Sequence, residues 1–445
     1  MGWAEQEWAM ADLGDERLNR RLVKVAQQLA DKPSQSIPTA CGPWADTIGA
    51  YRLLSNDRFD WRAVFEPHVH ATMRRMAAEP VVLCLQDTTE LDFNGQTTTG
   101  LGPLSYEAQR GMYLHPTYAV SPQREPLGML DAWMWAREPK DAQGNRPGII
   151  ESVRWIEGYE RLAERAPQLP TTRLVQVGDR ESDMLDLMQR AQSLDWPVDL
   201  LVRSQHNRVM PDGKYLWDQV QASDSVGEIA FSMGARPDQR ARVVKQHVRI
   251  KRMNLDAVGQ APLMMTCVIA SEYDVPEGQE PVRWRLLTNR DVTTLAEAIE
   301  LIDWYRARWE IEIFFHVLKT GCRVEALQLA TMERIERALA VFMVVSWRIA
   351  HLMRMGRTCP DLPADMFFDE DEIAAAYVLT KKTPPKTPPR LNDVIRRIAM
   401  LGGFLARKGD GEPGVKTIWV GLQRVLDCAT GLRFMREPDI DETCV

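Results

Sequence analysis

Four polar residues recur at helical spacing in one segment of the chain: Tyr305, Arg308, Glu312 and Lys319. Their offsets of 0, 3, 7 and 14 residues fall within about 60° of one face of a helix with 3.6 residues per turn. Large apolar residues fill the remaining positions, namely Trp304, Trp309, Ile311, Ile313, Phe314, Phe315 and Leu318. A helix that is apolar on most sides is normally buried, so the pattern predicts a charged stripe facing the protein interior.

This charged stripe has two physical interpretations. Burying arginine, glutamate and lysine together is costly unless they face one another, a metal ion or a phosphate. One interpretation is a structural set of ion pairs on a core helix. The other is a carboxylate metal ligand flanked by cations that bind phosphate, and it requires further carboxylates elsewhere in the chain.

Two aspartates lie where such carboxylates are needed. The apolar run 81–86 predicts a buried strand that ends at Asp87, and the run 173–178 predicts a second strand that ends at Asp179. Open α/β sheets bind their ligands at the carboxyl ends of strands, although a single aspartate there is more often a cap or turn residue. Together with Glu312, the two aspartates offer three hard carboxylate ligands, which suit two Mg²⁺ or Mn²⁺ ions acting on a phosphodiester.

The order of these residues resembles a known family. Asp87, Asp179 and Glu312, with the pattern Tyr-x2-Arg-x3-Glu-x6-Lys around the glutamate, are similar to the DDE transposases of bacterial cut-and-paste elements. The likeness is to the insertion sequence four group and the transposase of transposon five. It extends over nearly the whole chain and includes the segments 13–15 and 401–404. It implies a DNA transposase that binds element ends, cleaves them through a hairpin intermediate and joins them to target DNA.

The resemblance also assigns roles to residues outside the carboxylate set. It implies that Tyr305, Arg308 and Lys319 position phosphates, and that Arg203 lies near the DNA end. It implies that Trp284 stacks on a base flipped out of the duplex. From the residues alone, Trp284 is more simply interpreted as a core tryptophan.

We expect an α/β protein with three domains. Residues 1–70 would form a helical DNA-binding domain, in which Asp15 caps a helix carrying Arg20 and Arg21. The resemblance places these arginines on the element end, and the alternative is an ordinary helix with a solvated basic face. Residues 71–360 would form a ribonuclease H-like catalytic domain in βββαβ order, interrupted by an all-β insertion at about 195–290.

The third expected domain spans residues 361–445. A basic, proline-rich linker at 381–390 precedes two predicted helices at 391–401 and 415–426. In the second helix, Ile418, Trp419 and Leu422 would form an apolar ridge that stays exposed in a monomer. The resemblance implies that this region makes the homodimer of the paired-end complex.

Composition sets further expectations. The chain has 445 residues, 45% of them hydrophobic, which is enough for a sizeable core. We find no signal peptide and no apolar run of the roughly 18–20 residues that a membrane span requires, so we expect a bacterial cytoplasmic protein that joins the nucleoid when bound to DNA.

The net charge of −7 is unusual for a DNA-binding protein. The basic residues are nevertheless clustered, at 17–24, 236–252 and 381–390. Seven cysteines without a Cys-x2-Cys pair disfavour a disulfide framework and a zinc site.

Two other functions remain open from the sequence. A ribonuclease H-like, structure-specific nuclease would share the carboxylates but would need neither a pocket at Trp284 nor the C-terminal helices. A non-catalytic inhibitor would occupy element ends or trap partners in inactive dimers. The intact carboxylates argue against an inhibitor, whereas a chain that starts a few residues inside the first helix of the family pattern keeps it open.

Overall fold

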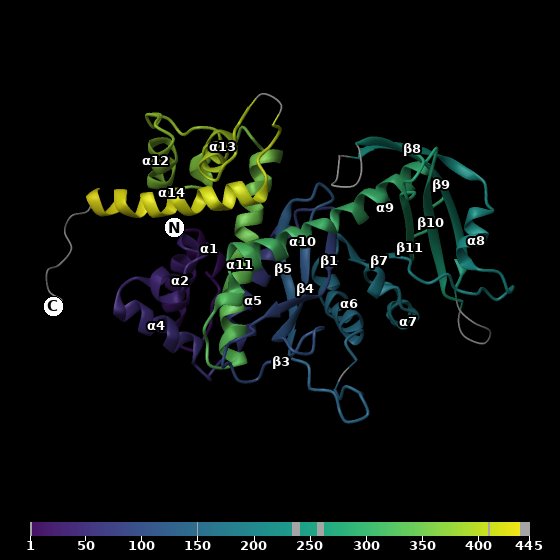
Figure 1. The fold of residues 1–445 in the computed structure, drawn as a ribbon, viewed down its shortest axis with the longest axis horizontal. Helices are drawn as coiled ribbons and strands as arrows, with labels where there is room; N and C mark the ends of the chain where they lie inside the picture. Colours follow the sequence, from purple (N-terminus) through teal and green to yellow (C-terminus); the bar gives the residue numbers. More distant parts are fainter. Residues whose placement is uncertain (1, 149, 234–240, 256–261, 408–409, 437–445) are drawn as a thin grey trace.

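A computed structural model describes residues 2–148, 150–233, 241–255, 262–407 and 410–436. The protein is a mixed α/β structure built on one large mixed sheet of 11 strands within these residues. Figure 1 shows the N-terminal and C-terminal helices at one end of the molecule and the strands β8 to β11 at the other. The first half of the sheet lies between them.

That first half has the strand order β5-β4-β1-β6-β7. Its strands are β1 (Val81–Gln86), β4 (Arg110–Val120), β5 (Pro126–Trp135), β6 (Arg173–Gly178) and β7 (Asp199–Arg203). Strand β4 is antiparallel to both β1 and β5, whereas β1, β6 and β7 are parallel. The short strands β2 (Thr89–Asp92) and β3 (Gly102–Pro103) also pair with β4. The two strands predicted to end at aspartates are therefore confirmed, and β4 and β5 form an antiparallel hairpin beside the first of them.

Helix α6 (Val153–Arg165) covers the sheet where β1 and β6 meet, and it packs on α7 (Leu185–Ser193). Its Gly158 lies so close to Gln86 that an added Cβ would come within 2.5 Å of the amide nitrogen. Gln86 in turn donates to Thr117 at 2.9 Å and accepts from Gln176 at 2.5 Å. These hydrogen bonds link the buried side chains of three neighbouring strands, which helps to fix the strand ends that carry the aspartates.

The second half of the sheet corrects one expectation, because the span 195–290 is neither all-β nor separate. It contains α8 (Leu216–Gln221) beside β8 (Ser225–Met233), β9 (Arg242–Asn254), β10 (Met264–Tyr273) and β11 (Arg283–Thr288). Strand β11 pairs antiparallel with β7, with Leu287 opposite Val202, so these strands continue the central sheet. The physical reason is that β7 would otherwise present an unpaired edge.

The N-terminal part is helical, as predicted. Its helices are α1 (Trp3–Glu7), α2 (Glu16–Asp31), α3 (Ile37–Cys41), α4 (Trp44–Leu54) and α5 (Trp61–Met76). Asp15 caps α2 by accepting the backbone N–H of Arg17 at 2.8 Å, as expected. Helix α5 runs across the expected domain limit at residue 70 and packs on β5 and on α11 (Met332–Thr358).

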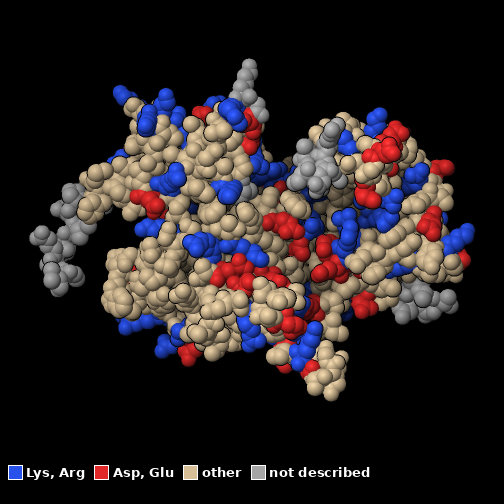
Figure 2. Space-filling view, in the orientation of Figure 1, with Lys and Arg blue, Asp and Glu red and all other residues tan. Residues whose placement is uncertain are grey.

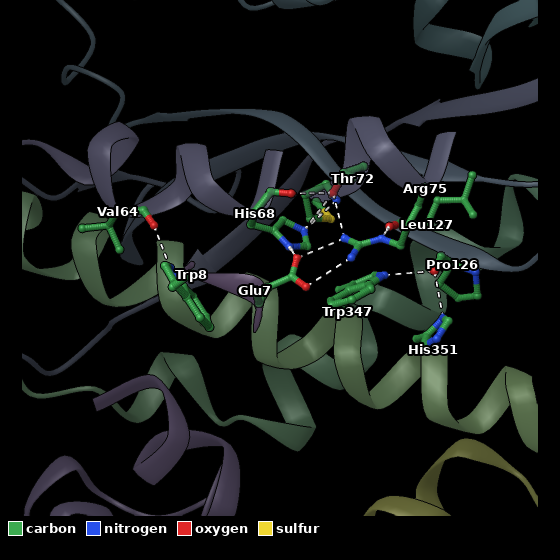
Figure 3. A network of polar contacts seen from close by, with 11 residues as sticks. Glu7, Trp8, Val64, His68, Thr72, Arg75, Pro126, Leu127, Trp347 and His351 are labelled. Atoms are coloured by element: carbon green, nitrogen blue, oxygen red, sulfur yellow. Dashed lines mark hydrogen bonds and ion pairs between the residues drawn. The ribbon is translucent and has the colours of Figure 1, made fainter. Parts of the chain in front are cut away.

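A buried polar network joins α1 to α5 and the sheet (Figure 3). The carboxylate of Glu7 lies 2.5 Å from Nδ1 of His68 and 3.0 Å from Nη2 of Arg75. The other ring nitrogen of His68 accepts the backbone N–H of Met129 in β5 at 2.9 Å. Burial opposes ionisation of Glu7, but His68 and Arg75 outweigh it and lower the pKa of this carboxyl to about 2. The N-terminal helices are therefore held firmly on the core.

The C-terminal part contains α12 (Glu370–Leu379), α13 (Leu391–Leu401) and α14 (Val415–Arg436). Helix α12 was not predicted, and α14 is longer than predicted. The expected exposed ridge is wrong: Ile418 and Leu422 are only 3% and 4% exposed, because α14 packs on α12 and α13 of the same chain. Instead, Phe434 and Met435 near the end of α14 are 61% and 69% exposed.

Helix α11 corrects the expectation about apolar runs. Its 27 residues are long and apolar enough to cross a membrane, but 83% of the most apolar stretch is buried inside the protein. The helix contacts α2, α5 and β5 along its length. Its apolar character is thus explained by its central place in the core.

Candidate functional site

The two aspartates meet at one edge of the sheet. Strands β1 and β6 pair Leu85 with Val177, and the same register carried two residues further brings Asp87 opposite Asp179. In each carboxylate, Oδ1 accepts a backbone N–H at 2.8 Å, from Thr88 and Glu181 respectively. These hydrogen bonds orient both groups at the carboxyl ends of parallel strands.

The segment that carries the four-residue pattern is not one regular helix. It consists of α9 (Leu295–Ala307), α10 (Trp309–His316) and a π-helical turn (Val317–Gly321). At the junction, the backbone N–H of Ile311 bonds to the carbonyl of Arg308, which is a spacing of three residues. The expected single face is therefore wrong, and the four side chains line two neighbouring pockets. Trp309, expected in the core, is 63% exposed and lines both.

The first pocket is acidic. It is lined by Asp87, Glu312 and Lys319, among others. Nη1 of Arg308 lies 2.5 Å from Oδ2 of Asp87 and 3.7 Å from Oε1 of Glu312, so one guanidinium bridges two carboxylates. The face in Figure 2 shows acidic and basic side chains next to one another over the middle of the molecule, where α10 passes the sheet.

Lys319 contacts a residue that sequence reasoning missed. Its Nζ lies 3.3 Å from the hydroxyl of Thr89 and 3.7 Å from Oε1 of Glu325. The same Glu325 oxygen accepts the backbone N–H of Asp92 at 2.9 Å. Glu325 sits in a short 3₁₀ turn that follows Arg323, whose backbone is left-handed with φ 50°. No periodic pattern in the sequence marks this turn.

Both other carboxylates, those of Asp179 and Glu312, act electrostatically on Asp87. Burial, together with repulsion from Asp179 and Glu312, raises the pKa of Asp87 to about 6, although Arg308 opposes this rise. Burial disfavours the charge of Arg308, but Tyr305, Asp87, Asp179 and Glu312 raise the pKa of its guanidinium. Asp179 therefore belongs to the same electrostatic cluster as the other two carboxylates.

The three carboxylates suit a divalent ion in ligand type but do not lie close enough together to hold one. As they stand, no three Asp, Glu, His or Cys side chains in the described part of the chain are close enough together to hold a metal ion. Arg308 occupies the space between Asp87 and Glu312 that a shared cation would take. Three carboxylates with mutual repulsion nevertheless fit Mg²⁺ or Mn²⁺ in ligand type, and the guanidinium stands in for the positive charge.

The second pocket is basic and aromatic, with a volume of about 800 Å³. The ring of Trp284 meets that of Tyr305 edge to face at 5.7 Å. The guanidinium of Arg203 lies 5.9 Å from the Trp284 ring. The indole N–H of Trp284 is buried without a hydrogen-bond partner. The structure thus brings together Trp284, Tyr305 and Arg203, which are far apart in the sequence.

Arg20 and Arg21 lie on α2 and line neither of these pockets. Arg20 is largely exposed, with Nε 3.8 Å from Glu16. Arg21 lies over Gly49 of α4, so closely that a Cβ there would clash with its guanidinium. Arg20 is therefore free to meet a ligand, whereas Arg21 also packs two helices together.

Comparisons with known proteins match three families along this chain. Residues 1–59 match the transposase DNA-binding family, residues 234–347 the transposase DDE domain, and residues 344–442 the transposase Tn5 dimerisation domain. Together these matches define a transposase with a DNA-binding domain, a DDE catalytic domain and a dimerisation domain. The chain belongs to the Tn5-like DDE transposases. The DDE match contains Glu312 but neither Asp87 nor Asp179.

Solved structures also match this chain, among them a cryo-EM structure of a piggyBac transposase synaptic complex with hairpin DNA. It is 7% identical over 99% of this chain and 78% of that chain, with a TM-score of 0.40. These values are too low to establish a shared mechanism.

Proposed function

We propose that this protein is a metal-dependent, cut-and-paste DNA transposase. It binds the ends of its element, cleaves them by phosphoryl transfer with a hairpin intermediate, and joins them to target DNA. The observation that carries the proposal is the meeting of Asp87 and Asp179 at one sheet edge, with Arg308 linking Asp87 to Glu312. The strand order β5-β4-β1-β6-β7, followed by a carboxylate on a later helix, supports a ribonuclease H-like catalytic core.

Asp87, Asp179 and Glu312 would hold two Mg²⁺ or Mn²⁺ ions. When bound, such ions activate the attacking hydroxyl and stabilise the charge on the leaving oxygen. Until then, Arg308 neutralises two of the carboxylates. Its fork-shaped guanidinium can then bind a DNA phosphate together with Tyr305, while Lys319 adds a point charge on the other side of Glu312.

Trp284 would receive a base extruded from the duplex at the cleaved end. The ring lies half-buried between Arg203 and Tyr305, with an unpaired N–H, so the pocket already has an aromatic surface and a free donor. Stacking on such a surface contributes about 1–3 kcal/mol per base.

The partners follow from the same proposal. Arg20 and Arg21 would contact the double-stranded element end, and two protein–DNA complexes would pair as a homodimer before cleavage. We also propose that the protein acts in the bacterial cytoplasm, on the nucleoid, where it would meet the element DNA.

The test uses a plasmid that carries the native element ends. Single substitution of Asp87, Asp179 or Glu312 by Ala should abolish Mg²⁺-dependent cleavage and leave binding to end DNA largely intact. Glu310→Gln is the control, because Glu310 faces Arg354 and Arg124 rather than the carboxylates. A variant of the three that still cleaves at the wild-type rate would remove that residue from the site. Cleavage without joining would indicate a nuclease, and end binding without cleavage a regulator.

A further inference from the structure

The basic pocket contains more arginines than the Arg203 and Arg308 already assigned to DNA contacts. Besides Arg203, it is lined by Arg180, Arg283 and Arg285. Within the described residues, none of these four arginines has a carboxylate within 4.0 Å, whereas Arg306 and Arg308 in the same pocket are paired with Asp303 and Asp87. Four guanidinium groups without a carboxylate partner repel one another around this pocket, although the chain as a whole carries a net negative charge.

Arg285 is the most firmly placed of them. Its guanidinium lies 3.7 Å from the centre of the Trp217 ring, which is a favourable cation–π contact. Trp217 is itself fixed, because its indole N–H donates to the hydroxyl of Ser204 at 3.0 Å. The backbone carbonyl of Arg285 accepts the N–H of the same serine at 2.8 Å. The side chain is thus held in place before any ligand arrives.

This fixed guanidinium also has an unused donor. Its Nε is buried without a hydrogen-bond partner, which is costly unless a ligand satisfies it. Burial, together with repulsion from Arg283, Arg203 and Arg180, lowers the pKa of Arg285. An anion bound among these groups would supply both the missing acceptor and the missing negative charge.

We propose that Arg285, supported by Trp217, forms with Arg283 and Arg180 a phosphate-binding subsite for the DNA backbone, beside the pocket of Trp284. The inference rests on the proposed function, since it takes DNA as the ligand. A nucleic-acid strand fits better than a single anion because it carries one phosphate per nucleotide and can meet several arginines at once. The fork of a guanidinium matches phosphate oxygens in geometry.

The first measurement is binding of native end DNA as a function of salt. Arg285→Gln should weaken binding and reduce the slope of log K against log salt by about 0.7–0.9, the value for one lost phosphate contact. Trp217→Leu should weaken binding in the same direction, because the guanidinium loses its support. A slope for Arg285→Gln equal to that of the wild type would overturn the subsite.

The matched control is Arg290→Gln. Arg290 also lies over a tryptophan, 4.8 Å from the Trp304 ring, but Glu300 already pairs with it at 2.8 Å. The Arg290→Gln substitution removes the same charge as Arg285→Gln and should leave the salt slope of DNA binding unchanged. An equal decrease in both variants would show that only overall charge matters, and would also overturn the subsite.

A second measurement separates this inference from the proposed function. Thermal unfolding is followed with and without inorganic tripolyphosphate, which needs neither element ends nor metal. The wild type and Arg290→Gln should be stabilised, and Arg285→Gln should lose most of that increase in Tm. If end DNA failed to bind while this difference persisted, the anion subsite would stand and the transposase proposal would fall. Equal stabilisation of all three proteins would overturn the subsite.

Discussion

At Asp87, the cluster of like charges should appear as a pH dependence of stability. The pKa of about 6 lies above the ordinary value of 3.8, so the folded protein binds this proton more tightly than the unfolded chain. The stabilising contribution of this group is therefore fully present below about pH 4 and is lost as the pH rises from about 4 to 6. For the metal-free protein we expect a loss on the order of 2 kcal/mol across this window.

Urea unfolding in the presence of a chelator measures this loss. Asp87→Asn should remove the corresponding slope between pH 4 and 6, whatever its effect on absolute stability. A wild-type slope retained in that variant would assign the titration to another group.

Arg20 and Arg21 should differ in what they contribute. Arg20→Glu should weaken end binding and lower its salt slope by about one unit with the Tm unchanged, because the side chain is exposed and loosely paired. Arg21→Glu should lower both affinity and Tm, because Arg21 packs over Gly49. Binding curves at several salt concentrations, with thermal unfolding beside them, test both. An unchanged slope for Arg20→Glu would place α2 away from DNA.

Single residues of the site differ in how far the sequence predicts them. Asp87 and Asp179 are predictable because a strand end is marked by a short apolar run that stops at an acidic residue. The bridge from Arg308 to Asp87 joins positions 221 residues apart, and no local pattern encodes a contact of that range. Glu325 is missed for the same reason.

At the scale of elements, the strongest expected effect lies in the network of Figure 3. Glu7→Gln should lower the free energy of unfolding by about 3–5 kcal/mol, because it disrupts the buried Glu7–His68 pair and leaves the partly exposed Arg75 without a full countercharge. The depressed pKa of Glu7 means that its contribution is present above pH 4.5 and is lost as the pH falls towards 2. Denaturant unfolding at pH 7 and at acid pH measures both effects.

His70→Gln provides the control, since the pair of His70 with Glu66 lies at 3.4 Å but is about half exposed. This change should cost less than about 1 kcal/mol. An equal loss in the free energy of unfolding for the two variants would mean that burial of the Glu7 network does not add to stability.

The periodicity of residues 304–320 shows where element prediction ends. A pattern counted at 3.6 residues per turn assumes an unbroken helix, and neither glycine nor proline marks the junction at Arg308. The tight turn there and the π-helical turn after His316 rotate successive side chains away from the assumed face. The division of these four side chains between two pockets could not be predicted from the spacing.

At the scale of the whole molecule, α14 offers a test of dimerisation. Phe434→Asp with Met435→Asp should leave single-end binding and Tm unchanged but prevent two complexes from pairing, because both side chains are exposed. Trp419→Glu should instead lower Tm, since Trp419 lies against the π-helical turn at Gly321. Native gels with end DNA resolve single-end and paired-end species. Pairing that survives the double substitution would move the interface elsewhere.

The limits of the insertion were harder to predict than its strands. The apolar runs at 198–204 and 282–287 are typical of β-strands, but no local pattern indicates that β11 pairs with β7. Such pairings are long-range, and strand register follows from the burial of whole faces rather than from either strand alone.

The pairing of β7 with β11 also fixes the distance between Asp179 and Trp284. Asp179 ends β6 and Trp284 lies in β11, and only β7 separates these two strands. Two strand spacings amount to about 10 Å, and Trp284 lies two residues along β11 from Leu286, which is level with Asp179. If DNA binds as proposed, backbone hydrogen bonds, rather than a hinge between modules, would set how far a cut phosphate lies from an extruded base. A change of register between β7 and β11 would shift the cleavage position along the DNA.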